Sequence, residues 1–336
     1  AQRDFGRATF YLERQGLFAA AGIFIMIVIS KIDYRIFIEK LPIIKIKPVT
    51  LLYFLCIILQ IYVLIFGEEI KGAKRWIQIG DFASFQPSEL TKLAVILLAA
   101  YIVNLAPRRL DKVTGFLRVI FFISPLLALV AVENFSTALV IGIIMVSICF
   151  VASRKKIYFI GIGLLFVAAG ALLIILEPFR VTRIDAWINV ETHDKGYQIL
   201  QGLYAIASGG IFGKGLGESM QKLGFIPESH NDMIFSVICE ELGLFGAVAL
   251  ILLFILLLWR IFIIAINAPD LFGGLIATGA LAHIAAQVLL NIAVVTSTIP
   301  STGIPLPFIS YGGSSIMVIL VEIGIVLSIS NQIRAG

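Results

Sequence analysis

The chain has 336 residues, of which 60% are hydrophobic and only 14% are charged, and its formal net charge is +5. A soluble domain carries about a quarter charged residues, so this composition excludes one and indicates a membrane protein. The positive charge does not indicate a nucleic-acid partner, because the basic residues are spread over short loops between apolar runs. Cys56, Cys149 and Cys239 lie in or near those runs without metal-ligand spacing, which predicts buried thiols.

Apolar runs close to the roughly 20 residues that cross a bilayer recur along the whole length of the chain. They predict an all-α polytopic membrane protein in which residues 1–336 form a single transmembrane domain. We expect nine visible transmembrane helices, at residues 17–32, 49–66, 89–106, 115–132, 135–152, 157–177, 232–262, 271–296 and 312–334.

The charge of the short loops predicts which side of the membrane each one faces. Basic residues gather in 31–47, 107–112 and 153–156, and the positive-inside rule places these loops in the cytoplasm. The first visible span then starts outside, so we expect that an earlier helix is missing ahead of Ala1, which would make ten helices. The outward-facing segments are 1–16, 67–88, 133–134, 178–231 and 297–311.

The large extracellular loop, residues 178–231, contains two features. The apolar residues of 196–207 recur at helical spacing, which predicts a helix that lies on or partly in the membrane. The glycine-rich segment 208–217 follows it and predicts a flexible turn, because a lone glycine-rich loop is a weak signal for phosphate binding.

Glu89 and Lys92 lie at the start of the third predicted span. Pro87 suits the first turn of a helix, and Glu89 lies where the helix dipole favours an acid, so a purely structural role stays open. Lys92 is on the same face and inside the membrane, where an unpaired ammonium would cost several kcal/mol. We therefore expect a Glu89–Lys92 ion pair that faces a wet cavity.

Asp232 comes just before the longest predicted span. Ser229 and Asp232 have the spacing of a capping box, so one interpretation of Asp232 is a helix cap. A second interpretation is a general base, because a carboxylate at a dry membrane boundary can be tuned to accept a proton. The neighbouring titratable groups that favour this second interpretation are Lys222, His230, Glu240 and Glu241.

The segment 299–315 is rich in proline, glycine and hydroxyl groups. Its prolines exclude a regular helix, and polar irregular backbone at membrane depth is tolerated only where it lines a cavity or is buried in protein. Ser310 and Tyr311 are therefore candidate cavity residues, and a simple re-entrant turn also explains the pattern.

Three blocks of this sequence resemble the signature sequences of the SEDS family, which includes RodA, FtsW and SpoVE. The blocks are KRWIQIG…FQPSELTKL, GKGLGESMQKLGFIPESHNDMIFSVICEELG and STGIPLPFISYGGSS, in the family's order between residues 71 and 315. The spacing around 217–223 looks more like the FtsW and SpoVE branch. The resemblance implies ten transmembrane helices with a large extracellular loop before the eighth.

The resemblance also implies an activity. It points to a glycosyltransferase of the bacterial cytoplasmic membrane that joins lipid II units into peptidoglycan on the outer face, together with a class B penicillin-binding protein. It implies that Asp232 is essential for catalysis and that Glu89 and Lys92 line the same central cavity. Many members carry Pro-Asp-x-Gly-Thr where residues 133–137 read Glu-Asn-Phe-Ser-Thr, so no role is carried over to that block.

We expect Asp232 to act as general base on the 4-hydroxyl of the acceptor sugar. A divalent cation could assist, although the sequence has no ligand cluster that is diagnostic of one. Two other functions stay open, a lipid II flippase and a scaffold that recruits a transpeptidase. The sequence does not distinguish a role in division, elongation or sporulation. The substrate-binding candidates are Lys74, Arg75, Glu89, Lys92, Arg180, Lys222, His230, Ser310 and Tyr311.

Overall fold

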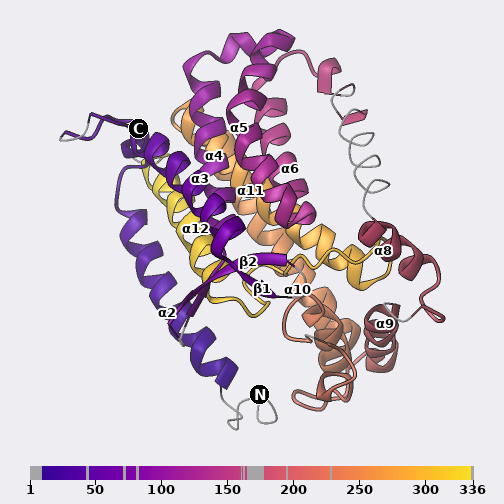
Figure 1. Cartoon of the computed structure of the whole chain (residues 1–336). Helices are drawn as coiled ribbons and strands as arrows, with labels where there is room; N and C mark the ends of the chain where they lie inside the picture. The colour runs from indigo at the N-terminus through magenta and orange to yellow at the C-terminus, as the bar shows by residue number, and fades with distance from the viewer. Residues whose placement is uncertain are drawn as a thin grey trace. The chain divides into compact units, whose positions relative to one another are not determined.

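The computed structural model describes residues 10–333, apart from 43–44, 71–72, 81–82, 160, 162, 165–177, 194–195 and 228. In this described part, eight helices are long and apolar enough to cross a membrane (Figure 1). They are α2 (Phe10–Ser30), α3 (Pro48–Phe66), α4 (Pro87–Leu105), α5 (Val113–Glu133), α6 (Phe135–Ala152), α10 (Ile234–Asn267), α11 (Leu271–Val295) and α12 (Gly313–Ile333). They confirm the all-α membrane class. The predicted span 157–177 lies mostly outside the described residues.

A small antiparallel sheet connects α3 to α4, and the sequence did not predict it. Its strands are β1 (Glu68–Ile70), β2 (Ala73–Ile79) and β3 (Ala83–Phe85), in the order β1-β2-β3. The two outer strands have three residues each, which is too short for alternating hydrophobicity to stand out. The remaining helical elements are η1 (Tyr34–Phe37), η2 (Pro107–Asp111), α8 (Pro178–Ile188), α9 (Tyr197–Gly209) and η4 (Gln221–Leu223).

The chain divides into two compact units. The first contains residues 1–156, 258–284 and 312–336, and the second contains residues 157–257 and 285–311. Both α10 and α11 contribute one part to each unit. The expectation of a single transmembrane domain stays a prediction.

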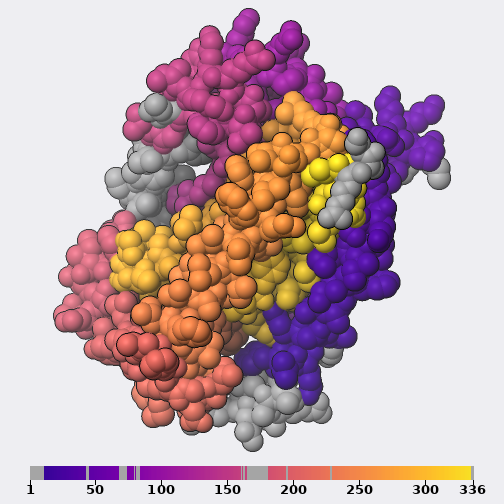
Figure 2. All heavy atoms as spheres, turned by 180° about the vertical axis from the view of Figure 1, so that it is seen from behind, coloured from indigo at the N-terminus to yellow at the C-terminus, as the bar shows by residue number. Residues whose placement is uncertain are grey.

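The first unit is built around α4, which is buried along most of its length. Pro87 occupies the first helical position, where the missing N–H costs nothing, and α3, α5 and α6 pack on α4. The yellow helix α12 packs along the indigo helix α2 (Figure 2). A Cβ on Gly324 would lie 2.9 Å from the carbonyl oxygen of Met26, so glycine allows these two helices to approach closely.

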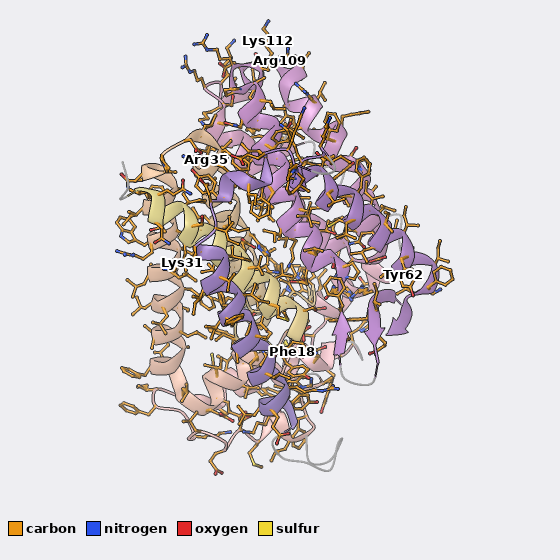
Figure 3. The ribbon with its side chains drawn as sticks, turned by 90° about the vertical axis from the view of Figure 1, so that its left-hand side faces the viewer. Phe18, Lys31, Arg35, Tyr62, Arg109 and Lys112 are labelled. Atoms are coloured by element: carbon orange, nitrogen blue, oxygen red, sulfur yellow. The ribbon has the colours of Figure 1, made fainter. Side chains whose placement is uncertain are left out.

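Basic residues gather toward one end of this unit. Figure 3 shows Arg35, Arg109 and Lys112 in its upper half and Phe18 in its lower half. This separation agrees with the predicted cytoplasmic loops, which carry the same cations.

Asp270 joins η1 to the start of α11 in the first unit. The Tyr34 hydroxyl and Arg35 Nε both donate to its Oδ2 atom at 2.8 Å, and the Gly273 N–H donates to Oδ1 at 2.8 Å. Burial alone would raise the pKa of Asp270, but the hydrogen bonds from Gly273, Tyr34 and Arg35 outweigh it. Its pKa therefore lies below the usual value of 3.8.

The second unit contains a break in α10. Gly243 has φ 64° and ψ −165°, which interrupts the helix although its apolar pattern continues. Residues 244–267 alone extend roughly 36 Å at about 1.5 Å per residue, enough to cross a hydrocarbon core of about 30 Å. Glu240 and Glu241 precede the break, so they do not belong to the part of α10 that is needed to cross the membrane.

Candidate active site

Asp232 lies in a turn just before α10, in the second unit. α10 begins at Ile234, so Ser229 is not its N-cap and the predicted capping box is wrong. The Ser-x-x-Asp spacing occurs here in a turn whose hydrogen bonds come from other parts of the chain.

The turn is fixed through three successive backbone carbonyl groups. Their donors come from the end of α11 and from the irregular segment 296–311. The hydrogen bonds run from Tyr311 N to His230 O at 2.8 Å, from Ser310 Oγ to Asn231 O at 2.6 Å and from Asn291 Nδ2 to Asp232 O at 2.8 Å. Because each of these carbonyls is held, the backbone fixes the direction in which the Cα–Cβ bond of Asp232 leaves the turn.

Asn291 connects this turn to the irregular segment. Its Nδ2 atom also donates to the carbonyl oxygen of Ile304 at 2.8 Å. Ser310 adds a second link within the segment, since its Oγ accepts from Leu306 N–H at 2.7 Å. The proline-rich segment is therefore an ordered support for Asp232, built from backbone groups that have partners.

The Asp232 carboxylate faces an amide donor and a cation. Gln198 Nε2 donates to its Oδ1 atom at 3.3 Å, and Arg183 of α8 interacts with it electrostatically. Burial lowers the pKa of Arg183 and Asp232 raises it, and Arg183 Nη1 also donates to the carbonyl oxygen of Ser301 at 3.1 Å. Arg183 and Gln198 are not among the residues predicted from the sequence, because both are distant from Asp232 along the chain.

The predicted residues His230, Ser310 and Tyr311 do lie at this turn. The rings of His230 and Tyr311 meet edge to face, with centroids 5.7 Å apart and an interplanar angle of 76°. The structure thus brings these three residues to Asp232, and their contacts position the turn.

Glu240 is fully buried and organises the end of the loop between α9 and α10. Its carboxylate accepts hydrogen bonds from Lys214 Nζ at 2.7 Å, from Ser208 Oγ, Ser219 Oγ, and from the N–H groups of Met220 and Gln221. Glu241 forms an ion pair with Lys222. Lys222, a predicted substrate-binding cation, is therefore engaged by a neighbouring acid.

The first unit contains the predicted ion pair between Glu89 and Lys92. Lys92 Nζ lies 3.0 Å from Glu89 Oε1, and both side chains are buried. Ser315 of α12 hydrogen-bonds to Glu89, and His283 of α11 interacts with it electrostatically. His283 Nδ1 lies 2.8 Å from Glu322 Oε2, a buried pair that the sequence analysis missed because its members have no helical spacing.

The pair itself is confirmed. That Glu89 and Lys92 share a cavity with Asp232 stays a prediction, as does their role in binding substrate.

The other predicted cations take different positions. In the first unit, Lys74 Nζ donates to a backbone carbonyl at the end of α3 at 3.3 Å, and Arg75 Nε donates to the carbonyl oxygen of Glu133 at 2.9 Å. The backbone of Arg180 belongs to α8, and its side chain lies outside the described residues. The three cysteines are free and buried, as expected.

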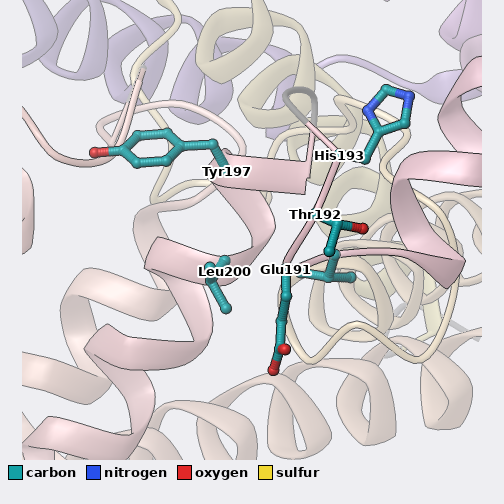
Figure 4. A pocket seen from close by; sticks show the side chains of 6 residues that line it. Glu191, Thr192, His193, Tyr197 and Leu200 are labelled. Atoms are coloured by element: carbon teal, nitrogen blue, oxygen red, sulfur yellow. The ribbon is translucent and has the colours of Figure 1, made fainter.

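A separate hollow of about 340 Å³ lies between the end of α8 and the start of α9 (Figure 4). Glu191, His193 and Tyr197 point in different directions from its wall, so they do not converge on one ligand. None of the predicted site residues lines it. Its lining residues are Val190, Glu191, Thr192, His193, Tyr197 and Leu200.

Within the residues that the structure describes, no group of three or more His, Cys, Asp or Glu side chains is placed to hold a metal ion. Assistance by a divalent cation stays a prediction.

Comparison with known proteins gives a consistent set of relatives. A family model described as Cell cycle protein, for FtsW, RodA and SpoVE, matches residues 1–335. Stage V sporulation protein E of Bacillus subtilis is 38% identical over 99% of this chain and 90% of its own length. A probable peptidoglycan glycosyltransferase FtsW of Geobacter sulfurreducens is 37% identical over 100% of this chain and 89% of its own length.

Solved structures agree with these relatives. A chain of a peptidoglycan synthase complex, described as coordinating polymerization and crosslinking, superimposes with a TM-score of 0.79 at 26% identity, over 97% of this chain and 90% of that one. The rod shape determining protein RodA of Thermus thermophilus superimposes with a TM-score of 0.69 at 26% identity, over 97% and 89%.

Proposed function

Since this chain belongs to the FtsW, RodA and SpoVE family, we propose that it is a peptidoglycan glycosyltransferase that polymerises lipid II. It is a multi-pass membrane protein, and we place its reaction on the outer face of the bacterial cytoplasmic membrane. The observation that carries the proposal is the anchoring of the turn that bears Asp232, because a general base must be held in a fixed direction.

Asp232 is the proposed general base. Its carboxylate takes the proton of the 4-hydroxyl of the acceptor N-acetylglucosamine, and the hydroxyl oxygen attacks the anomeric carbon of the donor muramyl unit. The glycosidic C–O bond forms as the C–O bond to undecaprenyl pyrophosphate breaks, with inversion, and the bonding electrons leave with the pyrophosphate. General-base help of this kind contributes about 10²–10⁴-fold to the rate.

Cations among the predicted substrate-binding residues are proposed to assist. Negative charge develops on the leaving pyrophosphate, and fixed positive groups stabilise it. Arg183 balances the charge of Asp232, whereas Lys92, paired with Glu89, is proposed to contact the substrate. We also propose that Lys74, Arg75 and the other predicted cations bind the substrate. No step is assigned to a metal ion.

A class B penicillin-binding protein is the proposed partner, since glycan strands must be cross-linked after they are polymerised. The similarity to a chain of a complex described as coordinating polymerization and crosslinking supports this partner. A lipid II flippase is the main alternative, and it predicts translocation of lipid II without polymerisation.

The test compares Asp232→Asn with the wild type, each purified with its partner and supplied with lipid II. Asp185→Asn is the matched control, because it removes a carboxylate from an exposed position of α8 in the same unit. We expect Asp232→Asn to lose polymerisation while both variants unfold at the wild-type midpoint. Polymerisation at the wild-type rate in a folded Asp232→Asn protein would remove the base role, and labelled lipid II crossing vesicles without polymerisation would favour the flippase.

A further inference from the structure

The loop between α9 and α10 is attached to both sides of the helix break. Before the break, the N–H groups of Lys214 and Gly215 donate to the carbonyl oxygens of Glu240 and Glu241, at 2.9 and 3.0 Å. After it, the N–H groups of Leu244 and Phe245 donate to the carbonyl oxygens of Gly210 and Ile211, at 2.9 and 3.1 Å. The loop backbone is therefore held against α10 at the position of the break.

Glycines make this attachment tight. Gly213 has φ +77°, and a Cβ at this position would overlap the carbonyl oxygen of Glu241. A Cβ on Gly243 would in turn overlap the Gly213 nitrogen. The glycine-rich segment that predicted a flexible turn is thus a close-packed connection, and Glu240 adds a buried carboxylate that holds it from the other side.

Large apolar side chains project from this connection. Phe212 is 85% exposed, Leu216 is 78% exposed and Phe245 is 74% exposed, with Ile211 and Leu244 also exposed. We call these five residues the loop surface. Removing a side chain of this size from water is worth about 1.5–3 kcal/mol, so a group of exposed ones indicates a contact with something apolar.

The break in α10 gives the level of the loop surface relative to a bilayer. The part of α10 that follows Gly243 is long enough to cross the hydrocarbon core by itself, so the break lies at one boundary of that core. The hydrogen bonds from Leu244 and Phe245 hold Gly210 and Ile211 at the same boundary. Exposed side chains continue from Phe245 to Val248 and Leu252 along α10, which are in the membrane-crossing part.

We propose that the loop surface inserts into the outer leaflet of the lipid bilayer. Two observations favour lipid over a protein partner. The loop surface is continuous with the apolar face of a membrane helix, and the loop backbone already has hydrogen-bond partners at that level, as a low-dielectric environment requires. Lys214, which lies between Phe212 and Leu216 in the sequence, directs its ammonium to buried Glu240.

The insertion has a consequence that rests on the proposed function. Residues 234–242 rise at most about 14 Å from the break toward the turn of Asp232. A loop that is fixed in the outer leaflet therefore sets the height of Asp232 above the membrane. That height must match the sugars of a substrate whose pyrophosphate lies at the lipid headgroups.

The test measures depth with a nitroxide spin label in the full chain, in vesicles of phosphatidylethanolamine and phosphatidylglycerol. The label is attached at Phe212→Cys. A label at Phe245→Cys is the reference for a position in lipid, and a label at Glu218→Cys is the reference for a position in water. Glu218 belongs to the same outer loop and is exposed. The background changes the native cysteines to alanine: Cys56, Cys149 and Cys239.

We expect the label at 212 to collide with oxygen and to be protected from a water-soluble nickel chelate, as at 245. Access of the chelate at 212 equal to that at 218 would overturn the proposal. Protection from both reagents would also overturn it, because a protein, either a partner or a second copy, would then cover the surface.

A second arm measures polymerisation in the same vesicles. We expect Phe212→Asp to raise the KM for lipid II roughly tenfold, whereas Glu218→Gln leaves it unchanged. The depth measurement does not need enzyme activity. A wild type that fails to polymerise would therefore count against the proposed function and leave the lipid contact standing.

Discussion

Glu240 offers a sharp test of how the loop between α9 and α10 is held. The carboxylate is fully buried, and each oxygen serves several donors. Oε1 accepts from Lys214 Nζ and Met220 N–H, and Oε2 accepts from Ser219 Oγ and Gln221 N–H. Replacing Glu240 with glutamine keeps the volume, removes the charge and turns one of these acceptors into a donor.

The expected magnitude follows from these contacts. A hydrogen bond to a charged group contributes about 1.5–3 kcal/mol, and glutamine loses those that reach one of the two oxygens. The Lys214 side chain is 35% exposed, so water replaces part of what the ammonium loses. Ser219 Oγ can rotate to accept from the new amide. We therefore expect Glu240→Gln to lower the free energy of unfolding by about 2–4 kcal/mol.

The assay is equilibrium unfolding in mixed micelles of a mild detergent and sodium dodecyl sulfate. Glu218→Gln is the matched control, because it makes the same change at an exposed position of the same loop. The double variant Glu240→Gln/Lys214→Met isolates the ion pair, for which we expect a coupling of about 1–2 kcal/mol. The reasoning fails if Glu240→Gln unfolds within about 0.5 kcal/mol of the wild type, as an ordinary surface change does.

Two further predictions concern the first unit. Replacing His283 with leucine leaves the Glu322 carboxyl buried without its partner, so we expect a loss of about 3–5 kcal/mol in the same assay, and His283→Leu/Glu322→Leu should recover most of it. A double variant as unstable as the single one would contradict a paired role. Asp270 predicts a pH dependence: its folded pKa lies below the usual 3.8, so its stabilisation is full above that pH and is lost as the pH falls through the folded pKa. The stability difference between wild type and Asp270→Asn should shrink below about pH 4, and a difference that stays constant there would refute the assignment.

Features that depend on local pattern were predictable from the sequence. A membrane helix needs only a sufficient apolar run, so the eight described spans follow from composition along the chain. The Glu89–Lys92 pair follows from helical spacing and the cost of an unpaired ammonium in the membrane. The helix at 196–207 follows from its periodicity and is α9 in the structure.

Features that depend on distant partners were not predictable. Asn291 and Asp232 are far apart along the chain. The sequence around each residue does not indicate that the Asn291 side-chain amide donates to the backbone carbonyl of Asp232. The capping box failed for a related reason. Its spacing is present, but the hydrogen bonds at Tyr311, Ser310 and Asn291 stabilise a turn, and the helix begins only at Ile234. The break at Gly243 was not predicted, because the apolar run continues through it and glycine is tolerated inside helices.

The block at residues 133–137 shows how a departure from a family pattern can be read in the structure. The side chain of Asn134 accepts from the N–H groups of Ser136 and Thr137, at 3.1 and 3.2 Å, and caps α6. Asparagine and aspartate are about equally good N-caps, so the cap is kept where the family has an acid. Glu133 is therefore an additional carboxylate at the end of α5 and not a displaced cap.

The three acidic residues Asp232, Glu240 and Glu241, near the start of α10, differ in their partners. Asp232 precedes the helix and its backbone is anchored, while its carboxylate accepts from Gln198 Nε2 and interacts electrostatically with Arg183. Glu240 and Glu241 lie further along, and their carboxylates are occupied by groups of the loop itself. A carboxylate that accepts several protein hydrogen bonds, as that of Glu240 does, has little capacity left for a substrate proton. The general-base role of Asp232 stays a proposal, and Glu240 and Glu241 hold the loop through their ion pairs with Lys214 and Lys222.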